Sequence, residues 1–295
     1  MVTIENSLIN KLTRRLTEGL RSGDQRQCLY VIDEALDSRF SPGIIYTNII
    51  SPANVEIGNL WHKGHISIAH EHVSTQISMK LLDHVLDKST NSLPNGLSAI
   101  VTSVQGDGHC LGAKMMSNLL SLDGWKVFYL GENTPADDIA RLVIESGSKV
   151  VALSVTLDRN IKNAIFSIEV LKNLIDPPLV VLGGAAISEN LLEFNEALVV
   201  TDPVSAVYKL RKEFCIGAEH LTLNGLLAQI GIKVFEKRKA IGRSQGQLAE
   251  LAGVDKAYIS LVENGKQNLT MGRLLRIAQA LDISVSDLLE TSSNL

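Results

Sequence analysis

The sequence contains few cysteines and few aromatic residues. The three cysteines have no CxxC spacing, which argues against a disulfide framework or a cysteine zinc site and suits a reducing compartment. The formal net charge is −4, so the chain as a whole lacks the basic field of a protein that binds nucleic acid over its entire surface. It also lacks an apolar run of membrane-spanning length and a secretory leader. We therefore expect a cytoplasmic protein without a membrane partner, long enough for two or three domains.

Hydrophobic periodicity divides the chain into three expected domains. Apolar residues at helical spacing predict a four-helix-bundle cap over residues 1–90. The expected breaks between its helices fall at 22–24, 41–43, 51–53 and near Gly64. Strands alternate with helices over residues 97–215, which predicts a Rossmann-like, doubly wound parallel sheet. Residues 222–291 are predicted to form an all-α domain, which makes the whole a multidomain α/β protein.

The loop after the first predicted strand combines Asp107, His109 and Gly112 in the pattern Asp-x-His-x-x-Gly. An apolar, β-branched segment precedes it and an apolar segment with helical spacing follows, so the loop lies where open α/β sheets bind ligands. A neutral imidazole binds a metal through one ring nitrogen, and a nearby carboxylate that accepts the other N–H fixes the tautomer. The pattern therefore predicts metal ligation by His109. The alternative is an ordinary Asp–His pair in a turn rich in glycine.

This motif resembles the corrinoid-binding domains of methionine synthase and the mutases. The resemblance implies a cobalamin cofactor, with His109 as the lower axial ligand of cobalt in place of the cofactor's own base. Later strand ends match the same family and imply a slot for the nucleotide tail, lined by Ser154, Thr156, Gly183 and Gly184. Hydroxyls can donate to phosphate or base, and glycines let a flat group lie against the backbone. A nicotinamide enzyme is disfavoured because the loop lacks the G-x-G-x-x-G pattern.

The predicted cap contains Trp61, nine intervening residues and then Glu71-His72. This spacing resembles the cap of the cobalamin-dependent photoreceptor regulators that control carotenoid synthesis. The resemblance implies that Trp61 shields an adenosyl group above cobalt and that Glu71 and His72 contact that group. It also implies that His62 ligates cobalt after light has cleaved the cobalt–carbon bond. The alternative makes Trp61 a core aromatic and His62 a surface residue, and the scatter of the nearby histidines disfavours a zinc site.

Residues 226–290 resemble the helix-turn-helix domain of the phage-repressor, or xenobiotic-response-element, family. Ser244 and Asp255 suit helix N-caps, and Gly253 suits the turn between two helices. Residues 222–266 carry seven basic and four acidic side chains, a local surplus that phosphates attract. The second helix of the motif enters the major groove with its N-terminal end. We expect base or groove contacts from Lys256, Ala257, Tyr258 and Ser260, and phosphate contacts from Arg243, Gln245 and Lys266. The alternative is a protein-binding helical module.

Together these features predict a cobalamin-dependent, light-responsive transcription regulator and not an enzyme. We expect adenosylcobalamin as cofactor, a double-stranded DNA operator as partner, and a homo-oligomer, either dimer or tetramer. Photolysis of the cofactor is expected to change the oligomer and its affinity for DNA. A light-independent sensor of cobalamin level and a corrinoid methyl carrier with an added DNA module are the alternatives. The known photoreceptor regulators carry a different DNA-binding domain at the N-terminus, so the sign of regulation need not transfer.

Overall fold

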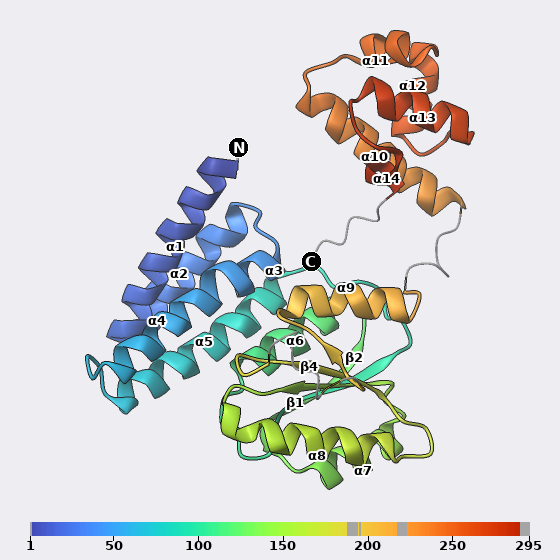
Figure 1. The fold of residues 1–295 in the computed structure, drawn as a ribbon. Coiled ribbons are helices and arrows are strands. Elements are labelled where there is room, and N and C mark those ends of the chain that lie inside the picture. The colour runs from blue at the N-terminus through green and yellow to red at the C-terminus, as the bar shows by residue number, and fades with distance from the viewer. Residues whose placement is uncertain (1, 188–193, 195, 217–222, 290–295) are drawn as a thin grey trace. The chain divides into compact units, whose positions relative to one another are not determined.

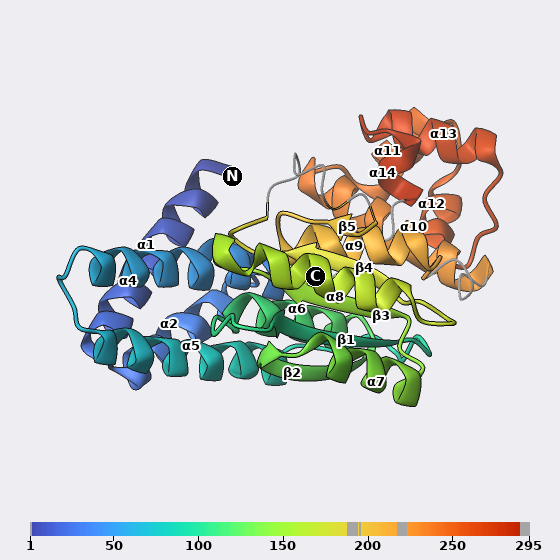
Figure 2. The ribbon, with the colours of Figure 1, turned by 60° about the horizontal axis from the view of Figure 1, so that its bottom comes forward.

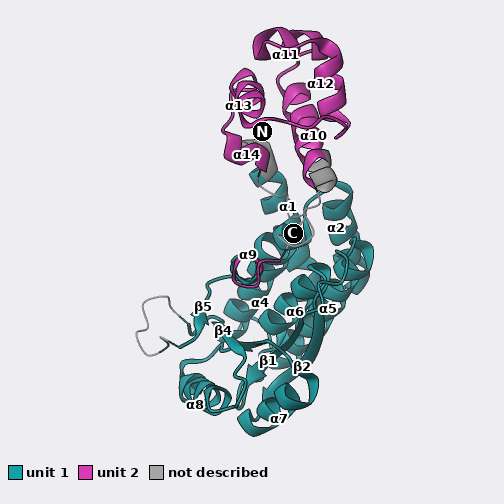
Figure 3. Cartoon of the chain, turned by 90° about the vertical axis from the view of Figure 1, so that its right-hand side faces the viewer, with its two compact units in different colours: residues 1–210, 295 teal, residues 211–294 magenta. Residues whose placement is uncertain are grey.

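The computed structural model describes residues 2–187, 194, 196–216 and 223–289 (Figure 1). The chain divides into two compact units, residues 1–210 and residues 211–294 (Figure 3). The first unit contains the helical bundle and the sheet, and the second contains the C-terminal helices. None of the described helices is long and apolar enough to cross a membrane.

The bundle is formed by four helical rods. They are α1 (Val2–Ser22), α2 (Gln25–Asp37), a composite of α3 (Pro42–Ile44), η1 (Ile45–Ile50) and α4 (Ser51–His62), and α5 (Ile68–Lys88). Leu12, Leu16 and Leu20 recur every four residues along α1, and each is at most 1% exposed. This stripe packs against α2, α4 and α5 and accounts for the hydrophobic periodicity. The predicted four-helix bundle is confirmed.

The predicted break at residues 51–53 is wrong, because the third rod continues as a helix through Pro52. The preceding segment η1 is a π-helix, and the Ser51 N–H donates to the carbonyl of Tyr46, five residues earlier. Pro52 has no N–H for the carbonyl of Asn48, and Thr13 Oγ1 donates to that oxygen instead at 3.1 Å. The third and fourth rods separate at Gly64, which has a φ of +72°.

The sheet has five parallel strands in the described part of the chain, in the order β2-β1-β3-β4-β5. Their bounds are β1 (Ser98–Val104), β2 (Lys126–Thr134), β3 (Val150–Ser154), β4 (Leu179–Gly183) and β5 (Leu198–Val199). The connecting helices are α6 (Leu111–Leu122), α7 (Ala136–Ser146), the short η2 (Asp158–Asn160), α8 (Ile161–Lys172) and α9 (Pro203–Glu213). Helices α7 and α8 cover one face and α6 and α9 the other (Figures 1 and 2), which confirms the doubly wound prediction.

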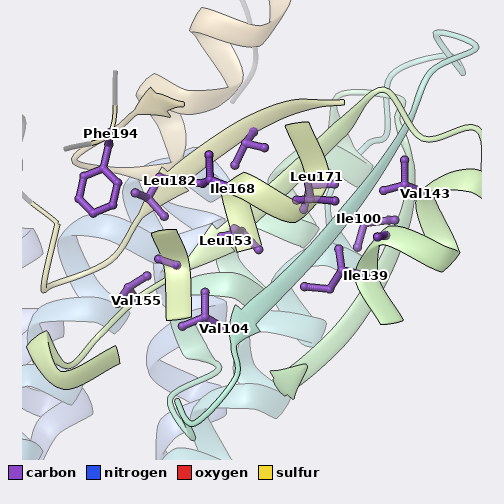
Figure 4. Packing of buried hydrophobic residues seen from close by; sticks show 14 of the residues in the cluster. Ile100, Val104, Ile139, Val143, Leu153, Val155, Ile168, Leu171, Leu182 and Phe194 are labelled. Atoms are coloured by element: carbon purple, nitrogen blue, oxygen red, sulfur yellow. The ribbon is translucent and has the colours of Figure 1, made fainter. Parts of the chain in front are cut away.

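Successive side chains of each strand alternate between the two faces of the sheet. Ile100, Val151 and Val180 are neighbours in register and belong to the buried cluster beneath α7 and α8. Figure 4 labels Ile100 among the residues of this cluster. The following residues on the same three strands therefore face α6. This second face holds the candidate site.

Helix α5 of the bundle packs on α6 of the sheet domain. The hydroxyl of Tyr46 donates to the carbonyl of Leu82 at 3.0 Å, and Asn118 Nδ2 donates to the same carbonyl at 3.0 Å. Asn118 also contacts the Tyr46 hydroxyl, at 3.3 Å, and all three groups are buried. Desolvation raises the pKa of Tyr46, so its hydroxyl stays neutral. A Lys114–Asp83 ion pair, 2.6 Å between Nζ and Oδ1, closes the same junction.

The second unit consists of short helices around its own core. They are α10 (Leu223–Ala240), α11 (Gln245–Ala252), α12 (Lys256–Glu263), α13 (Met271–Ala280) and α14 (Val285–Leu289). Ser244 forms a capping box with Gln247 at the start of α11, and Gly253 ends that helix with a φ of +64°. Asp255 Oδ1 accepts the Tyr258 N–H at 2.6 Å and caps α12. The predicted caps and turn are therefore present.

Candidate functional site

The carboxylate of Asp107 is completely buried and hydrogen-bonded through both oxygens. Oδ1 lies 2.8 Å from His109 Nδ1 and 3.1 Å from the His109 backbone nitrogen. Oδ2 accepts the backbone N–H of Thr156 at 2.7 Å. Desolvation would raise the pKa of Asp107, but these hydrogen bonds, led by that of Thr156, outweigh it and hold the pKa below its usual value. The carboxylate is thus ionised at neutral pH and can only accept.

Because Asp107 can only accept, Nδ1 of His109 must carry the proton and Nε2 must carry the lone pair. The His109 side chain is 50% exposed, and within the described residues nothing hydrogen-bonds to Nε2. The imidazole is therefore fixed in the tautomer that binds a metal through one nitrogen. This donor set fits a single axial ligand on cobalt.

Asparagine side chains from β2 and α8 hold the loop that carries His109. Asn133 Oδ1 accepts the N–H of Gly106 at 2.7 Å, and the Asn133 N–H donates to the Asp107 carbonyl at 3.1 Å. Asn163 Nδ2 donates to the carbonyl of Gln105 at 2.6 Å. The sequence analysis missed these residues, although the position of Asn133 at the polar end of an otherwise apolar segment was an available signal. These contacts hold the loop against β2 and α8.

A cleft of about 310 Å³ opens beside α6 on the second face of the sheet. Four of the predicted cofactor residues line it, namely Gly112, Ser154, Gly183 and Gly184. Gly184 has a φ of +118°, and a Cβ there would lie 2.2 Å from the carbonyl of Val155, so the position requires glycine. Thr156 does not line the cleft. Its contribution is the backbone N–H that holds Asp107.

The other predicted cofactor residues lie at the α4–α5 end of the bundle. Trp61 is 36% exposed, which contradicts a core role, and its ring meets that of His62 edge-on with centroids 4.7 Å apart. His62 Nδ1 lies 2.8 Å from the carbonyl of Gly58 and is the donor there, which leaves Nε2 with the lone pair. Glu71 accepts from Thr75 Oγ1 at 2.8 Å and pairs with His72 at 2.7 Å.

This end of the bundle and the carboxyl ends of the strands project to the same side of the first unit (Figure 2). Large apolar side chains are exposed on the bundle here, with Ile68 52% and Val73 49% accessible. An exposed apolar surface beside a concave site is typical of a ligand-binding surface. The exposed apolar end of the bundle is therefore a candidate ligand-binding surface.

The second helix of the predicted helix-turn-helix motif, the recognition helix, is α12, and its first residues face solvent. Lys256 and Ala257 are exposed and Ser260 is partly exposed, as DNA contacts require. The prediction that Tyr258 contacts DNA is wrong, because its side chain is 8% exposed and belongs to the core cluster. The guanidinium of Arg273 lies 4.5 Å from the centre of its ring. A side chain in this position cannot reach a base edge.

Two of the three predicted phosphate-binding side chains already have protein partners. Arg243 Nη1 donates to the carbonyl of Ala280, and Gln245 Nε2 donates to Glu263 Oε2 at 2.8 Å. The third, Lys266, is exposed. A hollow of about 520 Å³ lies at the start of α11, and its lining includes Phe235, Arg238, Lys239, Ser244, Gln245, Gly246 and Lys256. Lys239 was missed as a candidate and adds positive charge to this surface.

A buried ion pair fixes α12 to α10. The side chains of Arg238 and Glu263 are 5% and 4% exposed, and Arg238 Nη2 donates to Glu263 Oε2 at 2.9 Å. Arg238 Nη1 also donates to the Arg243 carbonyl at 2.8 Å. The hydrogen bonds to Glu263 raise the pKa of Arg238 and keep the pair charged. This pair orients the helix that carries Lys256.

Comparisons with known proteins identify three domains in the chain. Models of two B12 binding domain families match residues 12–86 and 97–203. A helix-turn-helix family model matches residues 234–288. The matches coincide with the bundle, the sheet and the second unit.

The methionine synthase of Mycobacterium leprae (strain TN) is 25% identical over 203 residues, which are 65% of this chain and 16% of that protein. The HTH-type transcriptional repressor CarH of Myxococcus xanthus is 26% identical over 165 residues, 55% of this chain and 54% of the repressor. The chain thus spans less than two thirds of either relative. The solved structure of the Methanosarcina barkeri monomethylamine corrinoid protein shares the fold, with a TM-score of 0.58 at 17% identity over 69% of this chain and 99% of that one.

Proposed function

We infer that this chain, which joins two B12-binding domains to a helix-turn-helix domain, is a B12-dependent transcription regulator. One observation carries the inference. Asp107 fixes His109 so that Nε2 is available as a ligand at the carboxyl edge of the sheet, in a chain that also carries a recognition helix. Cofactor state and DNA affinity can therefore be coupled within one molecule.

We propose that the cofactor is adenosylcobalamin and that light is the signal. When bound, the group supplies a cobalt–carbon bond that light cleaves. His109 would hold the group through Nε2, and the cleft that contains Ser154 and Gly183 would take its nucleotide tail. Trp61 would shield the group, and His62, whose Nε2 carries the lone pair, would supply a second imidazole ligand to it in the illuminated protein.

The two cofactor states would place different surfaces of the bundle in contact with solvent. A ligand can change an assembly only if it binds one assembly more tightly than the other. We propose that covering and uncovering the exposed apolar side chains of α5, among them Ile68 and Val73, provides this difference. A homo-oligomer would present two α12 helices to half-sites about 34 Å apart.

The test is to load the protein with adenosylcobalamin in darkness and to measure its absorption spectrum, oligomer size and DNA affinity before and after illumination. We expect all three to change. His109→Ala should abolish tight cofactor binding. His62→Ala should bind in the dark but give a different spectrum after illumination, whereas His65→Ala, an exposed neighbour, should behave as wild type.

A His109→Ala protein with full cofactor affinity and light response would refute the proposal. Tight binding in the dark, with oligomer and DNA affinity that follow cobalamin concentration and ignore light, would instead establish a cobalamin-level sensor. Equal acceptance of methylcobalamin without any DNA response would point to a methyl carrier.

A further inference from the structure

We propose that the cleft beside α6 selects corrinoids by the base of their nucleotide tail, and that Ala152 determines this selectivity. The inference rests on the proposed function, because it takes the occupant of the cleft to be the tail. The inference goes further by naming the chemical class of the base, an apolar fused-ring base such as benzimidazole in preference to a purine.

The floor of the cleft consists of two rows of side chains from three adjacent strands. In the first row Val101, Ala152 and Val181 are neighbours in register on β1, β3 and β4. In the second row, two residues nearer the carboxyl edge, Ser154 and Gly183 are neighbours in register on β3 and β4 and line the cleft. Both rows face α6 because side chains on one face recur every second residue. The floor is therefore apolar in its inner row and small or hydroxylic in its outer row.

The inner row creates the hollow because its central residue is the smallest. Ala152 stands between two valines, and its methyl group leaves space that a valine would fill. Helix α6 closes this region with Ala113 and Met116, which are 2% and 6% exposed. The lining residues with polar side chains are Ser51, Ser154, Thr201 and Asp202.

These polar residues lie toward the mouth of the cleft. Ser51 and Asp202 are partly exposed and Thr201 is exposed, whereas Ala152 is 5% exposed. Ser154 belongs to the outer row, and its hydroxyl has no hydrogen bond to any described residue. The backbone of β3 cannot substitute, since the ladders to β1 and β4 engage it on both sides. Among the described residues, the inner half therefore offers no side-chain partner for a polar base edge.

The base of cobalamin, dimethylbenzimidazole, ends in a carbon edge with two methyl groups. Adenine ends in ring nitrogens and an exocyclic amine, which need hydrogen-bond partners when buried. A polar group left without a partner in an apolar pocket weakens binding by about tenfold or more. The inner row should accept the first base and reject the second.

The test compares dissociation constants in the dark for cobalamin, an adeninyl cobamide and cobinamide, which has no base. Titration is followed by absorbance and by quenching of tryptophan fluorescence. Wild type should bind cobalamin at least about tenfold more tightly than the adeninyl form. Ala152→Val should weaken both tailed corrinoids by a similar factor and leave cobinamide affinity unchanged. Ala140→Val, which adds the same methyl groups on α7 beneath the opposite face, is the matched control.

Ala152→Ser provides a second measure if the valine variant folds poorly. Its hydroxyl supplies a partner in the hollow without filling it, so the preference for cobalamin over the adeninyl form should narrow. Equal or tighter wild-type binding of the adeninyl form, or unchanged ratios in Ala152→Ser, would overturn the selectivity alone. Failure of the wild type to bind any of the three corrinoids would overturn the proposed function and the selectivity with it.

Discussion

Replacing Asp107 with asparagine removes the negative charge beside His109 and keeps the size of the side chain. In the wild type the carboxylate accepts the backbone N–H groups of Thr156 and His109 and the ring N–H of His109. Asparagine has a single acceptor oxygen and a donor amide in place of the second oxygen. At least one of the buried donors must then face another donor.

The burial of these donors determines how much stability and cofactor affinity the substitution removes. A buried donor without an acceptor costs about 1–3 kcal/mol, so the free energy of unfolding should fall by about that amount. The imidazole also loses the charged acceptor that fixes its tautomer and increases the basicity of Nε2. Substituting such an outer partner of a metal ligand usually weakens metal affinity by about 10–100-fold. We therefore expect the dissociation constant for cobalamin to rise by that factor in Asp107→Asn.

The assay is equilibrium titration with cobalamin, with the spectrum of the bound cofactor as a second readout of axial ligation. Asp138→Asn, a change of the same type on the surface of α7, should have no effect. Asp107→Asn with unchanged affinity and spectrum would refute the role assigned to the Asp107–His109 pair.

The same variant has a pH signature in the cofactor-free protein. The pKa of Asp107 is lowered on folding, so its contribution to stability is present above the unfolded pKa of about 3.9 and is lost as pH falls through the folded value. The difference in unfolding free energy between wild type and Asp107→Asn should thus be constant near neutral pH and shrink below about pH 4. A difference that grows on acidification would contradict this assignment.

Three further predictions concern other parts of the chain. Glu263→Ala should destabilise the second unit by about 3–5 kcal/mol in thermal or urea unfolding, because it leaves Arg238 buried and unpaired, and replacing both residues with apolar ones should recover most of the loss. Cys28 is completely buried and its pKa is raised to about 11, so at pH 8 iodoacetamide should label the exposed Cys215 first; equal rates would contradict the packing of α2. Lys256→Ala should weaken DNA binding and reduce the salt dependence of the binding constant by about one ion, and an unchanged salt slope would remove Lys256 from the interface.

Features determined by neighbouring residues were predictable from sequence. Asp107 and His109 are two positions apart, so the turn between them sets their contact. Ser244 and Asp255 cap helices by bonding to backbone three residues ahead. The parallel sheet followed from the alternation of strand and helix patterns, which requires only local periodicity. These parts of the fold and site agree with the sequence predictions.

Features determined by distant contacts were not predictable. Pro52 indicates a helix break, and nothing nearby shows that Thr13 satisfies the carbonyl it leaves free. The position of Tyr258 near the N-cap of the recognition helix suggests a DNA contact. Packing against the core instead decides which side of that helix faces solvent. Arg243 is a predicted phosphate contact, whereas its guanidinium donates to the carbonyl of Ala280, 37 residues along the chain. In each case a partner far along the chain decides the outcome.

The junction between α5 and α6 limits how such regulators can be recombined. Helix α6 begins two residues after His109 and carries Asn118, whose amide meets Tyr46 and the Leu82 carbonyl of the bundle. A chimaera that exchanges the bundle alone would oppose this amide with an unmatched surface and leave its hydrogen bonds unmade. We therefore expect the bundle and the sheet to tolerate exchange only as one piece, and DNA specificity to be changed by exchanging the helix-turn-helix domain while that piece stays intact.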